Sequence, residues 1–295
     1  MSIDTISSLK STLSNDTSIK VCILDNNMIE MLTRISSTIT QDHIFGQYDI
    51  ILIPGWVYEE IQDSEVRVRY INELRDTYNL NVYVIEEKDY SELVDFKEAD
   101  LFYIFIHSCH LVTNLISFIN RNIINTRAPV NKIIEELPPY EEWMDKLYNE
   151  GFESKVLANH RIQKKNAGEI SICILAYILS IYYEKLENIT IFSFDGDTYN
   201  FVLRSKERLL KDARFTDCST KPITYKSNDV LIYEWLRQGL INETDLESIV
   251  NRIRQSRKVK YTKLAPDHSI EEHDQMLDNH SFCQLILQGN LHIIF

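Results

Sequence analysis

Uninterrupted apolar runs of strand length, separated by helical patterns, constrain the fold of this chain most strongly. Four of them are KVCIL (20–24), YDIILI (48–53), LNVYVI (80–85) and NITIFSF (188–194), and KPITYK around Ile223 is a candidate fifth. The runs stay apolar instead of alternating with polar residues, as expected for parallel strands that are covered on both faces. The sequence therefore predicts an α/β fold with an open, mostly parallel central sheet and helices on both faces.

Helical patterns lie between these runs. One begins near Pro54 and is predicted to continue as a single helix through WVYEEIQDSEVRVRYINELRDTY. The apolar positions that would form its inner stripe are Val57, Ile61, Val68 and Ile71. A second pattern, AGEISICILAYILSIYYEKL, is apolar on nearly every side, which predicts a central, buried helix.

The spacing of the runs predicts the domain organisation. About 100 residues separate the third run from the fourth, far more than one crossover requires, so residues from about 96 to 160 are predicted to form a helical insertion. The insertion would lie within one domain spanning residues 1–255. In the remainder, 256–295, the polar first part is expected to be a mobile linker and SFCQLILQGNLHIIF an apolar tail. Such a tail needs a docking surface on this chain or on another, which leaves an oligomer open.

Charge and cysteine content indicate which partners the protein can attract and in which compartment it is expected. The net charge of −13 disfavours broad attraction to nucleic acid or to anionic lipid, but it permits a local basic track and a site for divalent cations. Five widely spaced cysteines without a CxxC pair indicate reduced core residues of a cytoplasmic protein. The apolar run 101–119 contains His107, His110 and Asn114, so we expect a buried helix there and no membrane span.

Acidic residues gather where predicted strands end or helices begin. They are Asp25, Glu59, Glu60, Glu169, Asp195 and Asp197. In a parallel sheet these positions fall at one edge, where ligands bind. Carboxylates at close range raise one another's pKa unless a charge neutralises them, and a hard cation such as Mg²⁺ or Mn²⁺ commonly does so. The pattern predicts a metal site suited to phosphodiester hydrolysis.

Four motifs in this order resemble those of the PIN-domain nucleases, over residues 20–253. They are a strand ending in Asp-x-Asn, a P-x-x-V-x-x-E helix entry, a Gly-acid helix start and a strand ending in [ST]-x-D-x-D. The matching residues are Asp25 and Asn27, Glu60, Glu169, and Ser193, Asp195 and Asp197. The resemblance implies a metal-dependent nuclease, an endoribonuclease, in which Asp25, Glu60, Glu169 and Asp195 hold Mg²⁺ or Mn²⁺ with the assistance of Asp197.

Other residues would then serve the substrate. Asn27 and Ser193 are expected to support the metal ligands through hydrogen bonds. Arg161, Lys164 and Lys165, just before the central helix, are expected to grip phosphate. The resemblance implies a nucleic-acid substrate, RNA rather than DNA, and a role as a toxin held by an antitoxin partner or as a phage-defence effector.

Two alternatives stay open at this stage. A nuclease-like fold could be an inactive scaffold that only binds nucleic acid or protein. The run ITIFSFDGDT also resembles the hhhhDxDx[TV] motif of haloacid-dehalogenase phosphatases, although Tyr199 stands where that motif has Thr or Val. The sequence also leaves open whether Glu59 or Glu60 faces the site, and whether one metal or two would bind.

Overall fold

The computed structural model describes residues 4–15, 18–124, 137–157, 160–264 and 269–294 of the 295-residue chain. It confirms the predicted α/β class, with a five-stranded, fully parallel sheet in the order β3-β2-β1-β6-β7. The strands are β1 (Ile19–Leu24), β2 (Ile50–Pro54), β3 (Val82–Ile85), β6 (Leu186–Phe192) and β7 (Ile223–Lys226). β1 lies at the centre of the sheet, so the residue that follows it stands in the middle of the carboxyl edge.

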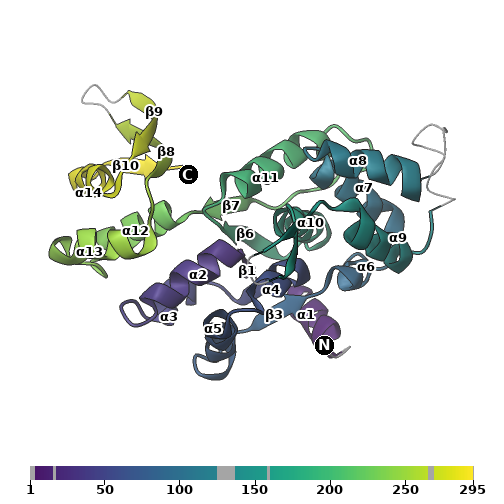
Figure 1. The fold of residues 1–295 in the computed structure, drawn as a ribbon, viewed down its shortest axis with the longest axis horizontal. Helices are drawn as coiled ribbons and strands as arrows, with labels where there is room; N and C mark the ends of the chain where they lie inside the picture. The colour runs from purple at the N-terminus through teal and green to yellow at the C-terminus, as the bar shows by residue number, and fades with distance from the viewer. Residues whose placement is uncertain (1–3, 16–17, 125–136, 158–159, 265–268, 295) are drawn as a thin grey trace.

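Helices pack on both faces of the sheet. In Figure 1, α2, α3 and α5 lie on one side and α7, α9 and α10 on the other. The helices of the sheet domain are α1 (Asp4–Leu13), α2 (Asn26–Ile35), α3 (Gln41–Phe45), α4 (Gly55–Ile61), α5 (Glu65–Asp76), α6 (Tyr90–Leu93), α7 (Glu98–Cys109), α8 (Thr113–Phe118), α9 (Tyr140–Lys146), α10 (Ala167–Tyr182), α11 (Gly196–Leu209), α12 (Asn228–Arg237) and α13 (Glu243–Ile253). α10 is buried along most of its length, as its all-round apolar pattern predicts.

The prediction of one continuous helix after Pro54 is wrong. The chain turns at residues 62–64, and α4 and α5 are separate helices. Ser64 starts α5, since its hydroxyl accepts the backbone N–H of Arg67 at 3.4 Å. A serine at this position satisfies an amide that the helix start leaves unpaired. The turn matters for the site because it brings Arg67 back to the side chain of Asn26.

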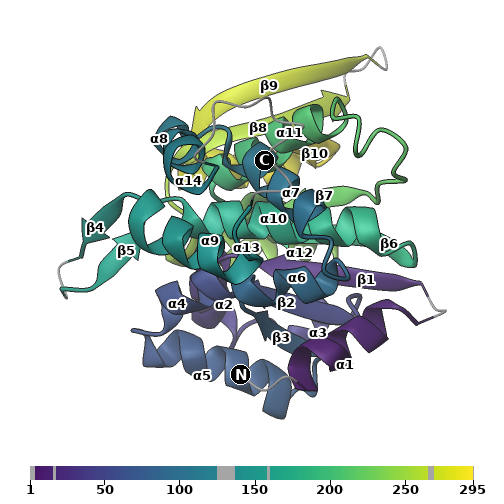
Figure 2. The ribbon, with the colours of Figure 1, turned by 90° about the vertical axis from the view of Figure 1, so that its right-hand side faces the viewer.

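The insertion between β3 and β6 is mainly helical, as expected, and it also contains a short hairpin. Besides α7, α8 and α9 it holds β4 (Ser154–Val156) and β5 (Ile162–Lys164), which pair antiparallel. Figure 2 shows this hairpin projecting from the side of the molecule where α4 lies. Residues 125–136 of the insertion lie outside the described ranges.

The expected linker after residue 256 is instead a β-hairpin. β8 (Arg257–Leu264) and β9 (Ile270–Leu277) pair antiparallel, and β10 (Leu291–Ile293) adds a third strand beside β8. With α14 (Asn279–Gln288) they form what we call the C-terminal module. The buried side chains of α14 and the contact of α14 with α13 show that the apolar tail docks on this chain.

Within the described ranges, no helix combines the length and apolar character needed to cross a bilayer. All five cysteines are free thiols, and four of them are buried.

Candidate active site

Asp25 follows β1 directly and begins α2. Its Oδ1 accepts the backbone N–H of Asn26 at 2.7 Å, and its Oδ2 accepts the hydroxyl of Ser193 at 2.5 Å. The side chain is buried, with 7% of the residue exposed. An ionised carboxylate offers about four lone-pair directions, so two hydrogen bonds orient it and leave room for a further partner.

Glu60, and not Glu59, faces the carboxyl edge of the sheet. Its Oε2 accepts the side-chain amide of Asn26 at 3.0 Å, whereas Glu59 accepts the hydroxyl of Tyr148. A Cβ added at Gly168 would lie 3.3 Å from Oε1 of Glu60. The carboxylate of Glu60 therefore rests against the first turn of α10, and glycine at this position allows the close approach.

Glu169 and Asp195 complete the group. Glu169 lies in the first turn of α10 and is partly buried. Asp195 begins α11, where its Oδ1 accepts the backbone N–H of Asp197 at 2.8 Å. Asp197 itself is exposed in the first turn of α11. We call Asp25, Glu60, Glu169 and Asp195 the carboxylate cluster.

The four acids interact electrostatically. Burial, together with the charges of Glu60 and Asp195, raises the pKa of Asp25 to about 7, although hydrogen bonds from Ser193 and Asn26 oppose the rise. Burial and the charges of Asp25, Glu60 and Asp195 raise the pKa of Glu169 to about 8. Near neutral pH, therefore, the cluster keeps protons that separate carboxyl groups in water would have lost.

Glu60 has a more compensated environment. Burial raises its pKa, and four partners lower it: hydrogen bonds from Asn26 and Gln163 and the positive charges of Arg161 and Arg67. The charge around the cluster thus differs from one acid to the next. Arginine side chains lie near Glu60, whereas the charges that act on Asp25 and Glu169 come from other acids.

Asn27 and Ser193 join the ends of β1 and β6. The hydroxyl of Ser193 accepts the side-chain amide of Asn27 at 3.4 Å and the backbone N–H of Asp195 at 3.1 Å. Oδ1 of Asn27 accepts the backbone N–H of Phe194 at 3.3 Å. These bonds hold Asp25 and Asp195 in a fixed relation.

The three basic residues predicted to grip phosphate do not stay together. Nη1 of Arg161 lies 3.5 Å from the backbone carbonyl of Glu60, and Lys164 lines the same small cavity beside Glu60. Lys165 instead pairs with Glu153 at 3.8 Å and lines a different cavity. Only Arg161 and Lys164 therefore accompany the cluster.

Sequence reasoning missed several residues of this region. Asn26 bonds to both Asp25 and Glu60, and its place inside the motif Asp-Asn-Asn was a usable signal. Arg67 lies on the helix that follows and carried no signal in the sequence.

Glu87, just after β3, is a further buried carboxyl that the sequence did not single out. Its Oε1 accepts the backbone N–H of Trp56 at 3.0 Å and the hydroxyl of Ser171. Burial raises its pKa to about 8. Because it joins the starts of α4 and α10, it supports the two helices that carry Glu60 and Glu169.

The donor set suits a hard divalent cation. All side-chain donors are oxygens, and burial together with neighbouring carboxylates raises the pKa values of Asp25 and Glu169. Among the described residues, no three His, Cys, Asp or Glu side chains are arranged to hold a metal ion as they stand. Mg²⁺ usually binds through one or two carboxylates and keeps several waters, so two carboxylates of the cluster are a sufficient protein ligand set.

Comparisons with known proteins leave the family open. No family model matches the chain, and neither the curated proteins nor the solved structures contain a significant match.

Proposed function

We propose that this chain is a metal-dependent nuclease that hydrolyses phosphodiester bonds, and specifically an endoribonuclease. One observation carries the proposal: Asp25, Glu169 and Asp195 come from distant parts of the sequence, yet the charge of Asp195 raises the pKa of Asp25, and the charges of Asp25 and Asp195 raise the pKa of Glu169. Maintaining such a cluster is costly unless a cation binds there. The preference for RNA and for internal cleavage rests on the resemblance to PIN-domain nucleases.

The chain's own residues would position the reaction. Two carboxylates among Asp25, Glu169 and Asp195 would hold Mg²⁺ or Mn²⁺, which would supply Lewis-acid activation of water and neutralise charge on the phosphate. Asn26 and Ser193 orient Asp25 through hydrogen bonds. The free cysteines are consistent with action in the cytoplasm, which is part of the proposal.

The decisive experiment compares cleavage of one labelled sequence as RNA and as DNA, with Mn²⁺, Mg²⁺ or EDTA. We expect metal-dependent cleavage that Asp25→Asn and Asp195→Asn reduce by more than the roughly 10- to 100-fold typical of residues that only support a ligand. Glu60→Gln should also lower the rate, while Glu59→Gln is its matched control, because Glu59 points to Tyr148. Equal activity of all variants, or cleavage in EDTA, would refute the proposal.

Metal binding can be measured without turnover. Mn²⁺ at 100 times its Kd should stabilise the wild-type protein by about 2.7 kcal/mol in thermal unfolding, and Asp25→Asn should lose this effect. A pure scaffold would show no Mn²⁺ effect in either form.

A further inference from the structure

A groove lies on the Asp195 side of the carboxylate cluster, between α2, the end of α13 and the start of β8. It encloses about 590 Å³. Asn27 and Phe194 line it, and both stand at the strand ends that carry Asp25 and Asp195. The groove is therefore adjacent to the candidate active site.

The groove is basic although the chain as a whole is acidic. Its basic lining residues are Arg34, Arg252, Arg254, Arg257 and Lys258, and among the described residues that line it Glu30 is the one acid. The whole chain has a net charge of −13. A local basic surface attracts anions to this place even in a protein of negative net charge.

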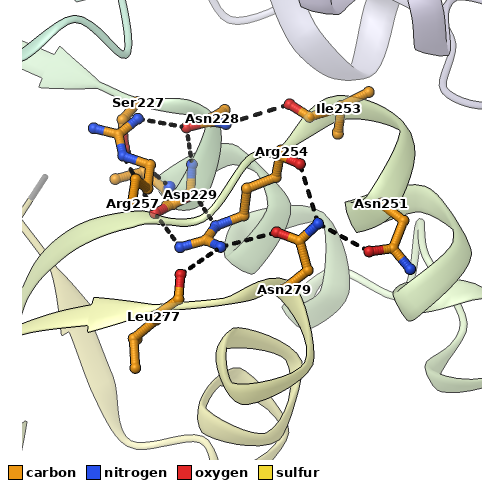
Figure 3. A network of polar contacts seen from close by, with 10 residues as sticks. Ser227, Asn228, Asp229, Asn251, Ile253, Arg254, Arg257, Leu277 and Asn279 are labelled. Atoms are coloured by element: carbon orange, nitrogen blue, oxygen red, sulfur yellow. Dashed lines mark hydrogen bonds and ion pairs between the residues drawn. The ribbon is translucent and has the colours of Figure 1, made fainter.

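A buried ion network lies at the base of the groove (Figure 3). Oδ1 of Asp229 accepts a hydrogen bond from Nε of Arg254 at 2.8 Å, and both side chains are fully buried. Nε of Arg257 lies 3.9 Å from Oδ2 of the same aspartate. One carboxylate thus fixes two guanidinium groups at the base of the groove.

Arg257 links the groove to the candidate active site. Its guanidinium lies 5.9 Å from the centre of the Phe194 ring, and the charge of Asp195 acts on it. Nη1 of Arg257 also donates to Oδ1 of Asn228 at 2.9 Å, which fixes the side chain. A fixed guanidinium beside an aromatic ring is an arrangement that binds a phosphate and a neighbouring base together.

We propose that this groove binds the sugar–phosphate backbone of a single-stranded nucleic acid and directs it to the carboxylate cluster. The claim that the strand is directed to the carboxylate cluster rests on the proposed function, whereas the claim that the groove binds the strand does not. β8 supplies Arg257 and Lys258, so the C-terminal module is part of the substrate-binding surface. A cavity of this volume matches a ligand of drug-like size, such as one or two nucleotides of an extended strand.

The test measures binding of fluorescent oligonucleotides to the full chain by anisotropy, in EDTA, over a range of salt concentrations. The probes are a single-stranded RNA, the same sequence as DNA, the corresponding duplex, and a polyglutamate peptide. The groove variant is Arg34→Glu with Lys258→Glu. Both residues are exposed and each forms an ion pair, with Glu30 and Asp274 respectively, so the fold should tolerate the change.

A matched control variant separates local from overall charge. Arg204→Glu with Lys88→Glu reverses two charges that are equally exposed and also ion-paired, with Glu207 and Glu86, and neither residue lines the groove. We expect the groove variant to bind single strands roughly tenfold or more weakly and to lower the salt slope by about 1.4, the value for two phosphate contacts. The control should bind like the wild type.

The outcomes distinguish this proposal from the nuclease assignment. Equal binding by the groove and control variants, no binding of single strands by the wild type, or equally tight binding of polyglutamate would overturn the groove proposal. Groove-dependent binding by a protein that cleaves nothing would support it and refute the nuclease function. Metal-dependent cleavage with an unchanged KM in the groove variant would do the reverse.

Discussion

Two groups of acidic side chains in the described part of the chain have opposite surroundings. In the carboxylate cluster, Asp25 and Glu169 lie near other acids, and their pKa values rise to about 7 and about 8. In the network at the base of the groove, Asp229 faces Arg254 and Arg257. Arg254 also donates to the carbonyl of Leu277 at 3.1 Å.

The difference separates a structural use of charge from a functional one. The Asp229 network joins α12 to the C-terminal module through bonds that the chain supplies itself, and it needs no ligand (Figure 3). The carboxylate cluster holds negative charge that a cation would neutralise. Removing a residue of the Asp229 network should therefore destabilise the fold, whereas removing a residue of the carboxylate cluster should reduce the proposed activity.

The largest expected effect comes from breaking the compensated region. Arg254→Ala leaves Asp229 buried without its closest cation, which typically costs about 3–5 kcal/mol in the free energy of unfolding. Urea unfolding at neutral pH measures the loss. The control is Arg204→Ala, an exposed pair with Glu207, for which we expect less than about 1 kcal/mol. Similar losses in the two variants would mean that the network does not hold the module in place.

A second test uses Glu87, whose carboxyl is buried and hydrogen-bonded like that of Asp25. Its pKa is about 8 in the folded protein against an ordinary 4.5, so the stability that it contributes is fully present below pH 4.5 and is lost as pH rises to 8. Between pH 5 and pH 8.5, the wild type should lose on the order of a few kcal/mol more than Glu87→Gln, whose amide does not ionise.

Urea unfolding of both forms in EDTA measures this difference, in which the contributions of Asp25 and Glu169 cancel. Parallel pH profiles for the two proteins would show that Glu87 does not carry its proton into the folded state.

The smallest effect concerns the spacing inside the cluster. Gly168→Ala places a Cβ 3.3 Å from Oε1 of Glu60 and from Cγ2 of Val57, so the carboxylate must shift slightly. We expect metal-dependent cleavage to fall roughly tenfold, since small misplacements at reacting groups are costly. Stability should rise by at most about 1 kcal/mol, because alanine favours a helix over glycine. Unchanged cleavage with raised stability would show that the position of Glu60 is not critical.

Much of the fold and the site could be predicted from the sequence. Apolar runs such as 20–24 and 188–194 are covered on both faces, and that leaves parallel strands as their natural arrangement. Once the strands are parallel, Asp25 and Asp195 must meet at one edge, because each directly follows a strand or nearly so. Local pattern and sheet geometry agree there, which is why the prediction that Asp25 and Asp195 lie at one edge needed no tertiary information.

The C-terminal module could not be predicted in this way. Most residues of β9 are exposed, and its sequence lacks the apolar alternation that marks a half-buried strand. The polar composition of the segment from 256 onward instead suggested a mobile linker. The pairing of β8 with β9 and β10 depends on backbone hydrogen bonds, which the pattern of side chains does not reveal.

The sequence alone determined that acids follow β1 and β6 and lie in the first turn of α10, because local apolar patterns predict where strands end and where helices begin. Only the tertiary structure decided that Glu60 and not Glu59 faces Gly168, since packing sets the rotation of a helix about its axis. It also brought Arg257 against Phe194, a contact between residues about 60 positions apart that no local pattern encodes.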